Sequence, residues 1–111
     1  MNAELTYAIK FVSDMEKAIA FHQNKLGLKL RFQTPGWSEF ETGDVTLALH
    51  PATPENPNGS VQLGYKVADL RDLYARRAEM GLEFTSPPRE EHGTWLARFR
   101  DADGAECSIS Q

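Results

Sequence analysis

The chain has 111 residues, of which 41% are hydrophobic and 25% are charged, a composition typical of one soluble globular domain. The formal net charge of -4 disfavours nucleic acid and anionic membranes as partners. A single cysteine excludes an internal disulfide and no apolar run is long enough to span a bilayer, so we expect a cytoplasmic protein without a membrane partner.

The first half of the chain predicts a strand, a helix and three further strands. Strands are predicted at 5–12, 28–33, 37–41 and 45–50, where apolar and ring-bearing residues lie between turn signals. The helix begins after Asp14, because its carboxylate can accept hydrogen bonds from the free amides of the first turn. Gly27 supplies a left-handed C-cap. The apolar face of this helix is predicted to carry Met15, Ala18, Ile19, His22 and Leu26.

The second half repeats this order after a proline-rich linker at 51–60. It predicts a strand at 61–67, a helix from Asp69 to Met80, and a strand at 82–85 that ends in a turn at 86–88. A polar loop at 89–93 and strands at 95–100 and 105–110 follow. Since Asp69 corresponds to Asp14, duplication is the simplest explanation. We therefore predict one α+β domain over residues 1–111, with module 1 at about 1–50 and module 2 at about 61–111.

Two stretches carry a family resemblance, and they read VSDMEKAIAFHQNKLGL and RDADGAECSIS. Together with the paired βαβββ order, they resemble the vicinal oxygen chelate superfamily. That superfamily includes glyoxalase I, extradiol dioxygenases, fosfomycin resistance enzymes and bleomycin resistance proteins. The resemblance covers nearly the whole chain and implies curved mixed sheets that form a cleft, with the helices outside. It says less about function, because this scaffold hosts many chemistries.

The resemblance also implies four metal-ligand positions, on the first, fourth, fifth and eighth strands, where metal-dependent members carry His or Glu. In this sequence they are occupied by Tyr7, Ala48, Gln62 and Ser108. Phenol, amide and hydroxyl groups are poor ligands for Zn²⁺, Ni²⁺ or Fe²⁺, and alanine has no donor atom. A register shifted by one residue would offer Ala8 or Leu63, which are no better. We therefore expect no cofactor, and we expect the three polar side chains to hydrogen-bond an organic ligand or to line a wet groove.

The histidines and the cysteine differ in what their positions predict. His50 shares a strand face with Ala48 and is the candidate catalytic residue, as an acid/base group or a lone metal ligand, or else a structural strand-end residue. His22 is expected in the core and His92 in a solvated loop. Cys107 is expected to be a buried small hydrophobe.

Large rings and one arginine complete the set of candidates. Trp37, Phe40 and Trp95 either shape the cleft or belong to the core. Arg98 alternates with Phe99, so it would face the cleft and meet an anionic ligand if Phe99 packs under the helices; otherwise it is solvated. The predicted ligand-binding residues are Tyr7, Trp37, His50, Gln62, Arg98 and Ser108.

Two functions of different classes follow from these observations. The favoured one is a homodimeric protein similar to bleomycin resistance proteins, which binds a small organic ligand and lacks the usual metal site. The alternative is a divalent-metal-dependent lyase, isomerase or dioxygenase of the glyoxalase type. It would use His50 with a carboxylate such as Glu39 or Glu41 as non-standard ligands. The sequence leaves the ligand's identity and the question of catalysis open.

Overall fold

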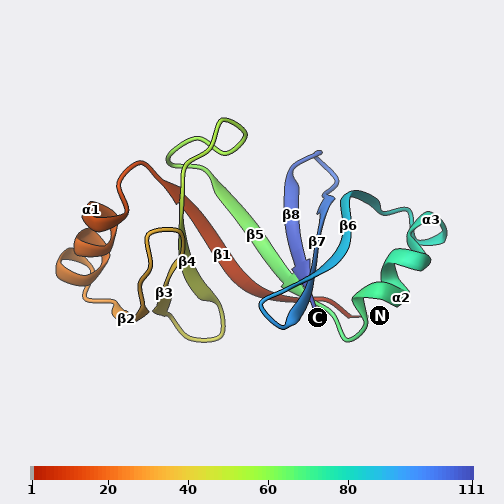
Figure 1. Cartoon of the computed structure of the whole chain (residues 1–111), viewed down its shortest axis with the longest axis horizontal. Helices are drawn as coiled ribbons and strands as arrows, with labels where there is room; N and C mark the ends of the chain where they lie inside the picture. Colours follow the sequence, from red (N-terminus) through yellow and green to blue (C-terminus); the bar gives the residue numbers. More distant parts are fainter. Residues whose placement is uncertain (1) are drawn as a thin grey trace. The chain divides into compact units, whose positions relative to one another are not determined.

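Residues 2–111 are described by a computed structural model, in which two βαβββ modules follow one another. This order confirms the predicted α+β class and the duplicated arrangement (Figure 1). The elements are β1 (Glu4–Val12), α1 (Met15–Ala20), a π-helical turn (Phe21–Lys25), β2 (Lys29–Phe32), β3 (Ser38–Glu41), β4 (Thr46–Pro51), β5 (Val61–Lys66), α2 (Leu70–Ala75), α3 (Arg77–Met80), β6 (Glu83–Glu91), β7 (Thr94–Arg100) and β8 (Glu106–Ser110).

The chain divides into two compact units. The first unit comprises residues 6–62, and the second comprises residues 63–111 with the N-terminal residues up to Leu5. The boundary at residue 62 lies just past the linker that the prolines predict. Within residues 2–111, no helix has the length and apolar character needed to cross a membrane.

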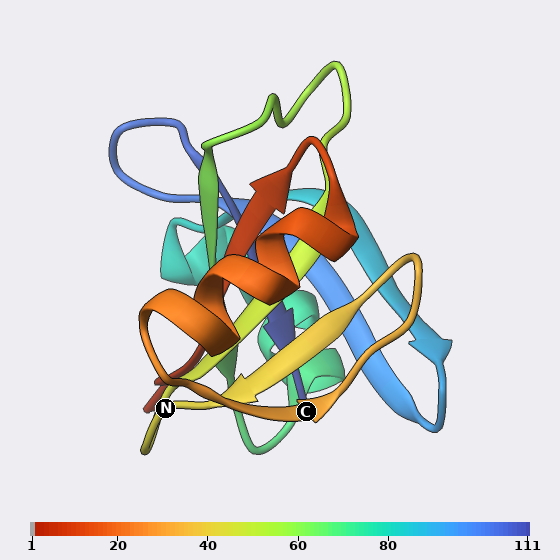
Figure 2. The same ribbon diagram turned by 90° about the vertical axis from the view of Figure 1, so that its left-hand side faces the viewer.

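The first unit is a four-stranded sheet with α1 on one face. Its strand order is β2-β3-β4-β1, in which β1 runs parallel to β4 and β3 runs antiparallel to both its neighbours. Helix α1 lies across the strands in Figure 2. Ile19 from this helix packs with Val12, Phe40 and Leu49 from the strands. The opposite face carries a separate buried cluster of Ile9, Phe11 and Ala48.

The beginning of α1 agrees with the sequence prediction, and its end does not. The Asp14 carboxylate accepts a hydrogen bond from the Lys17 amide at 3.0 Å, which confirms the N-cap. After Ala20, however, the chain continues as a π-helical turn until the left-handed Gly27. A π-helix turns less per residue than an α-helix, so later residues move off the apolar stripe. The placement of Leu26 on that stripe is therefore wrong, since this side chain is 56% exposed.

His22 lies in the core, as its position on the helix predicts. Its Nδ1 atom lies 2.7 Å from the Ala18 carbonyl oxygen, which can only accept a hydrogen bond. Its ring packs 5.5 Å from the ring of Phe40. The side chain is thus a buried and satisfied part of the first unit.

The second unit repeats the arrangement with the strand order β5-β8-β7-β6. Leu70 and Leu73 of α2 pack against Val67, Ala97 and Ile109. The Asp69 carboxylate accepts from the Asp72 amide at 3.0 Å, which confirms the second N-cap. The predicted single helix is interrupted at Arg76, and α3 ends at the left-handed Gly81.

Strand β6 is longer than the sequence predicts. We expected a turn at 86–88 and a polar loop at 89–93, but the strand continues to Glu91. The pairing with β7 shifts register twice, between Phe84 and Ser86 and again before Arg89. Because β6 is the outer strand of this unit and the prolines lie within these irregularities, their missing amides do not break the sheet. The turn itself is confined to His92 and Gly93, both with positive φ, and His92 is solvated as expected.

Candidate functional site

A buried carboxylate lies on the face of the first unit opposite α1. Glu39 is only 7% exposed. Its neighbours Ser38 and Phe40 are completely buried, and Phe40 packs with α1, so strand alternation turns Glu39 to the other face. The register pairs Glu39 with Ala48 of β4. We call this surface, defined by Tyr7, Trp37, Glu39, Ala48 and His50, the Glu39 face.

Three side chains satisfy the Glu39 carboxylate. The Trp37 indole Nε1–H donates to Oε2 at 2.8 Å, and the Arg31 guanidinium donates to Oε1 at 2.9 Å. The Tyr7 hydroxyl makes a longer contact of 3.5 Å with Oε2. A buried carboxylate is costly unless it is paired and hydrogen-bonded, so these contacts explain why the charge is tolerated. The sequence indicates Glu39 only as an alternative metal ligand, although alternation with Phe40 along the strand places Glu39 on the same face as Trp37.

The Tyr7 phenol remains protonated in this environment. Burial raises its pKa above the ordinary value, the negative charge of Glu39 raises the pKa further, and Arg31 opposes this effect. The phenol therefore acts as a neutral hydrogen-bonding group.

Aromatic rings form the rest of the Glu39 face. The Tyr7 and Trp37 ring centroids lie 5.9 Å apart, and those of Trp37 and His50 lie 6.3 Å apart with an interplanar angle of 81°. The His50 ring also lies 5.1 Å from the ring of Phe11, its cross-strand partner on β1. The structure thus brings three of the six predicted ligand-binding residues together, namely Tyr7, Trp37 and His50.

The hydrogen bond of His50 fixes which ring nitrogen carries the proton in the neutral form. Nδ1 lies 2.7 Å from the Pro51 carbonyl oxygen, which is only an acceptor, so Nδ1–H is the donor. Nε2 is then an acceptor with no hydrogen-bond partner among residues 2–111. Every fully buried side-chain nitrogen or oxygen in that range has a partner, so Nε2 is accessible to solvent.

The other three predicted residues are Gln62, Arg98 and Ser108. Gln62 belongs to the first unit and is 6% exposed. Arg98 and Ser108 are cross-strand partners in the second unit, where Arg98 is exposed while Phe99 packs in the helix-side cluster. Their role in ligand binding stays a prediction.

Two of the rings that the sequence offered as cleft-shaping are core residues instead. Phe40 is completely buried beside α1. Trp95 packs with the α2-side cluster of the second unit, and the Arg71 guanidinium lies 4.5 Å from its ring centroid. Cys107 is buried, as expected, and burial raises the pKa of its thiol.

Of the five residues that define the Glu39 face, only Glu39 and His50 have side chains that commonly bind metal ions. Within residues 2–111, no three His, Cys, Asp or Glu side chains gather closely enough to hold one. Glu39 is already bound to Trp37 and Arg31, and Glu41 pairs with Lys29 at 3.1 Å. Ala48 contributes only a methyl group.

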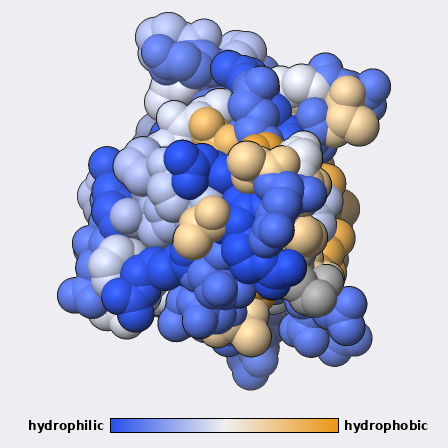
Figure 3. Space-filling model, turned by 90° about the vertical axis from the view of Figure 1, so that its right-hand side faces the viewer, coloured by the Kyte–Doolittle hydropathy of each residue, from blue (hydrophilic) through white to orange (hydrophobic). Residues whose placement is uncertain are grey.

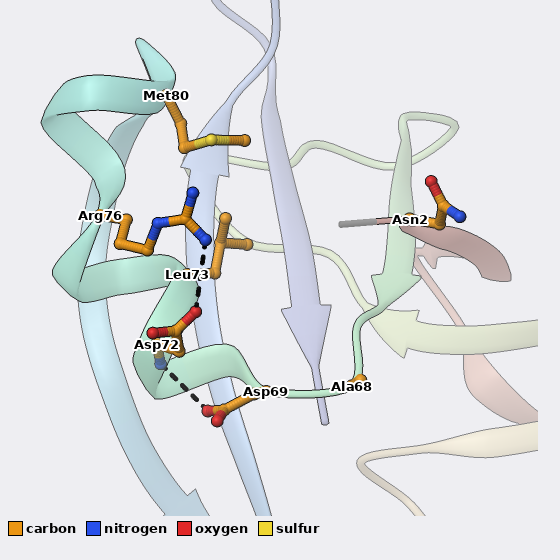
Figure 4. A pocket seen from close by; sticks show the side chains of 7 residues that line it. All are labelled: Asn2, Ala68, Asp69, Asp72, Leu73, Arg76 and Met80. Carbon is orange, nitrogen blue, oxygen red and sulfur yellow. Dashed lines mark hydrogen bonds and ion pairs between the residues drawn. The ribbon is translucent and has the colours of Figure 1, made fainter.

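Two surface cavities of the second unit differ in their chemistry from the Glu39 face. The larger, of about 290 Å³, is lined by Asn2, Ala68, Asp69, Asp72, Leu73, Arg76 and Met80 (Figure 4). Its charged groups are engaged, because Asp69 caps α2 and Asp72 pairs with Arg76 at 3.7 Å. The smaller, of about 180 Å³, has an apolar lining that includes Leu73, Leu82 and Phe84. Hydrophilic residues cover most of the side that carries α2 and α3 in Figure 3.

Comparisons with known proteins agree with this fold. The model of the Glyoxalase/Bleomycin resistance protein/Dioxygenase superfamily matches residues 5–109. A superfamily member from Vibrio splendidus 12B01 has a TM-score of 0.72 and 15% identity, with 99% of each chain covered. Methylmalonyl-CoA epimerase from Mycobacterium tuberculosis has a TM-score of 0.75 and 18% identity, covering 96% of this chain and 85% of that one.

A mutant of 4-hydroxymandelate synthase from Streptomyces coelicolor has a TM-score of 0.70 and 22% identity. That match covers 96% of this chain and 38% of the synthase. Comparison with curated proteins finds no significant match. At these identities the structural likeness concerns the fold alone.

Proposed function

Since the chain belongs to the glyoxalase/bleomycin resistance protein/dioxygenase superfamily, we propose that it is a member that binds a small organic ligand on its Glu39 face. The observation that carries this proposal is the Trp37 indole, held by a 2.8 Å hydrogen bond to the buried Glu39 between the rings of Tyr7 and His50. An aromatic surface with a few fixed polar groups is how proteins commonly hold small molecules. A buried, fully satisfied carboxylate keeps that surface rigid.

We also propose that ligand binding by this protein involves no metal ion. Tyr7, Ala48, Gln62 and Ser108 stand at the positions where the family resemblance implies metal ligands. A metal site needs about three strong donors, and these four side chains offer none of the imidazole, thiolate or carboxylate groups that transition metals prefer.

One observation favours a second function, a divalent-metal-dependent lyase, isomerase or dioxygenase. It is the accessible Nε2 atom of His50, which has the lone pair that a metal ligand or a general base requires. Glu39 and Glu41 are poorly suited as its partners, because both already form ion pairs. Elemental analysis for Ni²⁺, Zn²⁺, Fe²⁺ and Mn²⁺ after dialysis separates the two functions. About one ion per chain that is lost in His50→Ala would support the second function and contradict the first.

The ligand proposal is tested by fluorescence quenching with a library of small aromatic compounds. The chain has two tryptophans, so the variants Trp95→Phe and Trp37→Phe each report from one unit. We expect quenching in Trp95→Phe, which retains Trp37, and its loss when Tyr7→Ala is added. Quenching seen only in Trp37→Phe would move ligand binding to the second unit.

We also propose that the protein acts as a homodimer. Large apolar side chains are exposed in the single chain, among them Phe21 at 52% and Val61 at 55%. Such residues are often covered by a partner. Light scattering over a range of concentrations should give twice the chain mass of 12.5 kDa. A monomer that persists at high concentration would contradict this part of the proposal.

A further inference from the structure

The hydrogen-bond donors at the centre of the Glu39 face are already in use. The Trp37 Nε1–H donates to Glu39 at 2.8 Å, and an indole nitrogen has no second donor. The Tyr7 hydroxyl is the donor in a long contact of 3.5 Å with the same carboxylate oxygen. The His50 Nδ1–H donates to the Pro51 carbonyl. A ligand that reaches these three side chains therefore finds no free N–H or O–H among them.

Acceptor atoms, by contrast, remain available on the same side chains. His50 offers the accessible lone pair of Nε2, and the Tyr7 oxygen keeps its lone pairs because it is the donor in its contact with Glu39. The raised pKa of Tyr7 keeps this oxygen protonated and neutral at physiological pH. Free acceptors set among rings favour a flat ligand that donates hydrogen bonds.

The charges on this face act in the same direction. The Glu39 carboxylate lies within hydrogen-bond distance of Trp37 and so repels an anion placed on the rings. Arg31 is the cation nearest to Glu39, and its Nη1 is held by Glu39 at 2.9 Å and by Thr46 at 3.3 Å. Because Glu39 already pairs with this guanidinium, the carboxylate offsets much of the positive charge that would attract an anionic ligand.

We propose that the Glu39 face selects planar ligands that donate a hydrogen bond, such as an aromatic ring with a hydroxyl or amino group, and that His50 Nε2 is the acceptor. The same ring with a carboxylate is disfavoured. This inference rests on the proposed ligand-binding function and adds to it the class of ligand and a specificity-determining residue.

Three naphthalene compounds with the same ring system test the inference by calorimetry at pH 7.5. 2-Naphthol donates a hydrogen bond, 2-methoxynaphthalene can only accept, and 2-naphthoate is an anion. We expect 2-naphthol to bind about fivefold more tightly than 2-methoxynaphthalene, as one additional neutral hydrogen bond predicts. We expect 2-naphthoate to bind more weakly than either.

His50→Phe is the decisive variant, because it keeps a ring and removes the acceptor. It should abolish the preference for 2-naphthol over 2-methoxynaphthalene and retain binding of both. His92→Asn is the matched control, since His92 is a solvated turn residue in the second unit and asparagine tolerates its positive φ of 51°. This control should keep the full preference. Nitrogen-15 spectra of the His50 ring should also show the proton on Nδ1, and a proton on Nε2 would overturn the inference.

The remaining outcomes separate the inference from the function on which it rests. Equal affinities for 2-naphthol and 2-methoxynaphthalene would overturn the donor preference and leave ligand binding intact. Tightest binding of 2-naphthoate, lost in Arg31→Gln, would reverse the preference to anions. If none of the three compounds bound at millimolar concentration, the aromatic ligand site itself would be refuted, and the inference with it.

Discussion

The two tryptophans occupy similar places in the repeat and lie on opposite sides of their sheets. Trp37 directly follows Gly36, whereas Trp95 is separated from Gly93 by Thr94. Trp37 lies on the Glu39 face, away from α1, and Trp95 packs in the cluster on the α2 side. Because side chains alternate along a strand, one added residue is enough to turn a ring to the other face. The duplicated fold thus gives a ring on the proposed ligand-binding face in one unit and a ring in the helix-side cluster in the other.

Truncating a ring in the core of the first unit should have the largest effect on stability. Phe40 is completely buried beside α1, so Phe40→Ala should lower the free energy of unfolding by about 3–5 kcal/mol. Phe32→Ala on the neighbouring strand is the control, because Phe32 is 43% exposed and its loss should cost about 1 kcal/mol or less. Urea denaturation followed by circular dichroism measures both. Similar costs for the two variants would mean that Phe40 does not lie under the helix.

Removing the Glu39 carboxylate should have the next largest effect. Glu39→Ala leaves the Trp37 N–H and the Arg31 guanidinium without their acceptor, and we expect a loss of about 2 kcal/mol. Glu41→Ala lies two residues away and removes only the exposed pair with Lys29, so it should cost less than about 0.5 kcal/mol. The same denaturation experiment applies. Equal effects would show that Glu39 is not the centre of the face.

Removal of the helix caps should affect both units alike. Asp14→Ala and Asp69→Ala each remove a 3.0 Å hydrogen bond to a first-turn amide, and each should cost about 1 kcal/mol. Neither variant should change the affinity for a ligand of the Glu39 face, since neither aspartate belongs to that face. Full stability in both variants would refute the capping role that the repeat predicts.

The smallest expected effect is a decrease of the free energy of unfolding at alkaline pH that depends on Tyr7. The folded chain holds the Tyr7 proton more tightly than the unfolded chain, whose tyrosine pKa is the ordinary 10.0. The stabilisation from Tyr7 is therefore complete below about pH 10 and is lost as the pH rises above it. Tyr7→Phe should lose less stability than the wild type between pH 9 and pH 11. Parallel curves for the two proteins would indicate that Tyr7 is not desolvated.

The sequence predicted the fold well because its local signals and periodicity agree in both halves. Asp14 and Asp69 cap their helices as expected, and the strands follow the predicted order. Strand β6 was predicted too short, because proline is a turn signal in sequence and yet fits an outer strand at a register shift.

The candidate site was predicted less completely, because it depends on which strand face each side chain takes and on contacts between distant strands. Tyr7 and Glu39 are 32 positions apart in the sequence, so no local pattern predicts their contact. Phe40 and Trp95 could have been separated from Trp37 by strict alternation from the helix-facing residues. The proton position on His50 depends on the 2.7 Å contact with Pro51, which requires the structure.

The claim that the Glu39 face binds the ligand is tested most directly by the two indole N–H signals in nitrogen-15 spectra. Trp37→Phe assigns them, since it removes one signal and leaves that of Trp95. Adding a compound that quenches Trp37 fluorescence should shift the Trp37 signal in a saturable way and leave the Trp95 signal in place. A saturable shift of Trp95 with an unmoved Trp37 would contradict the account.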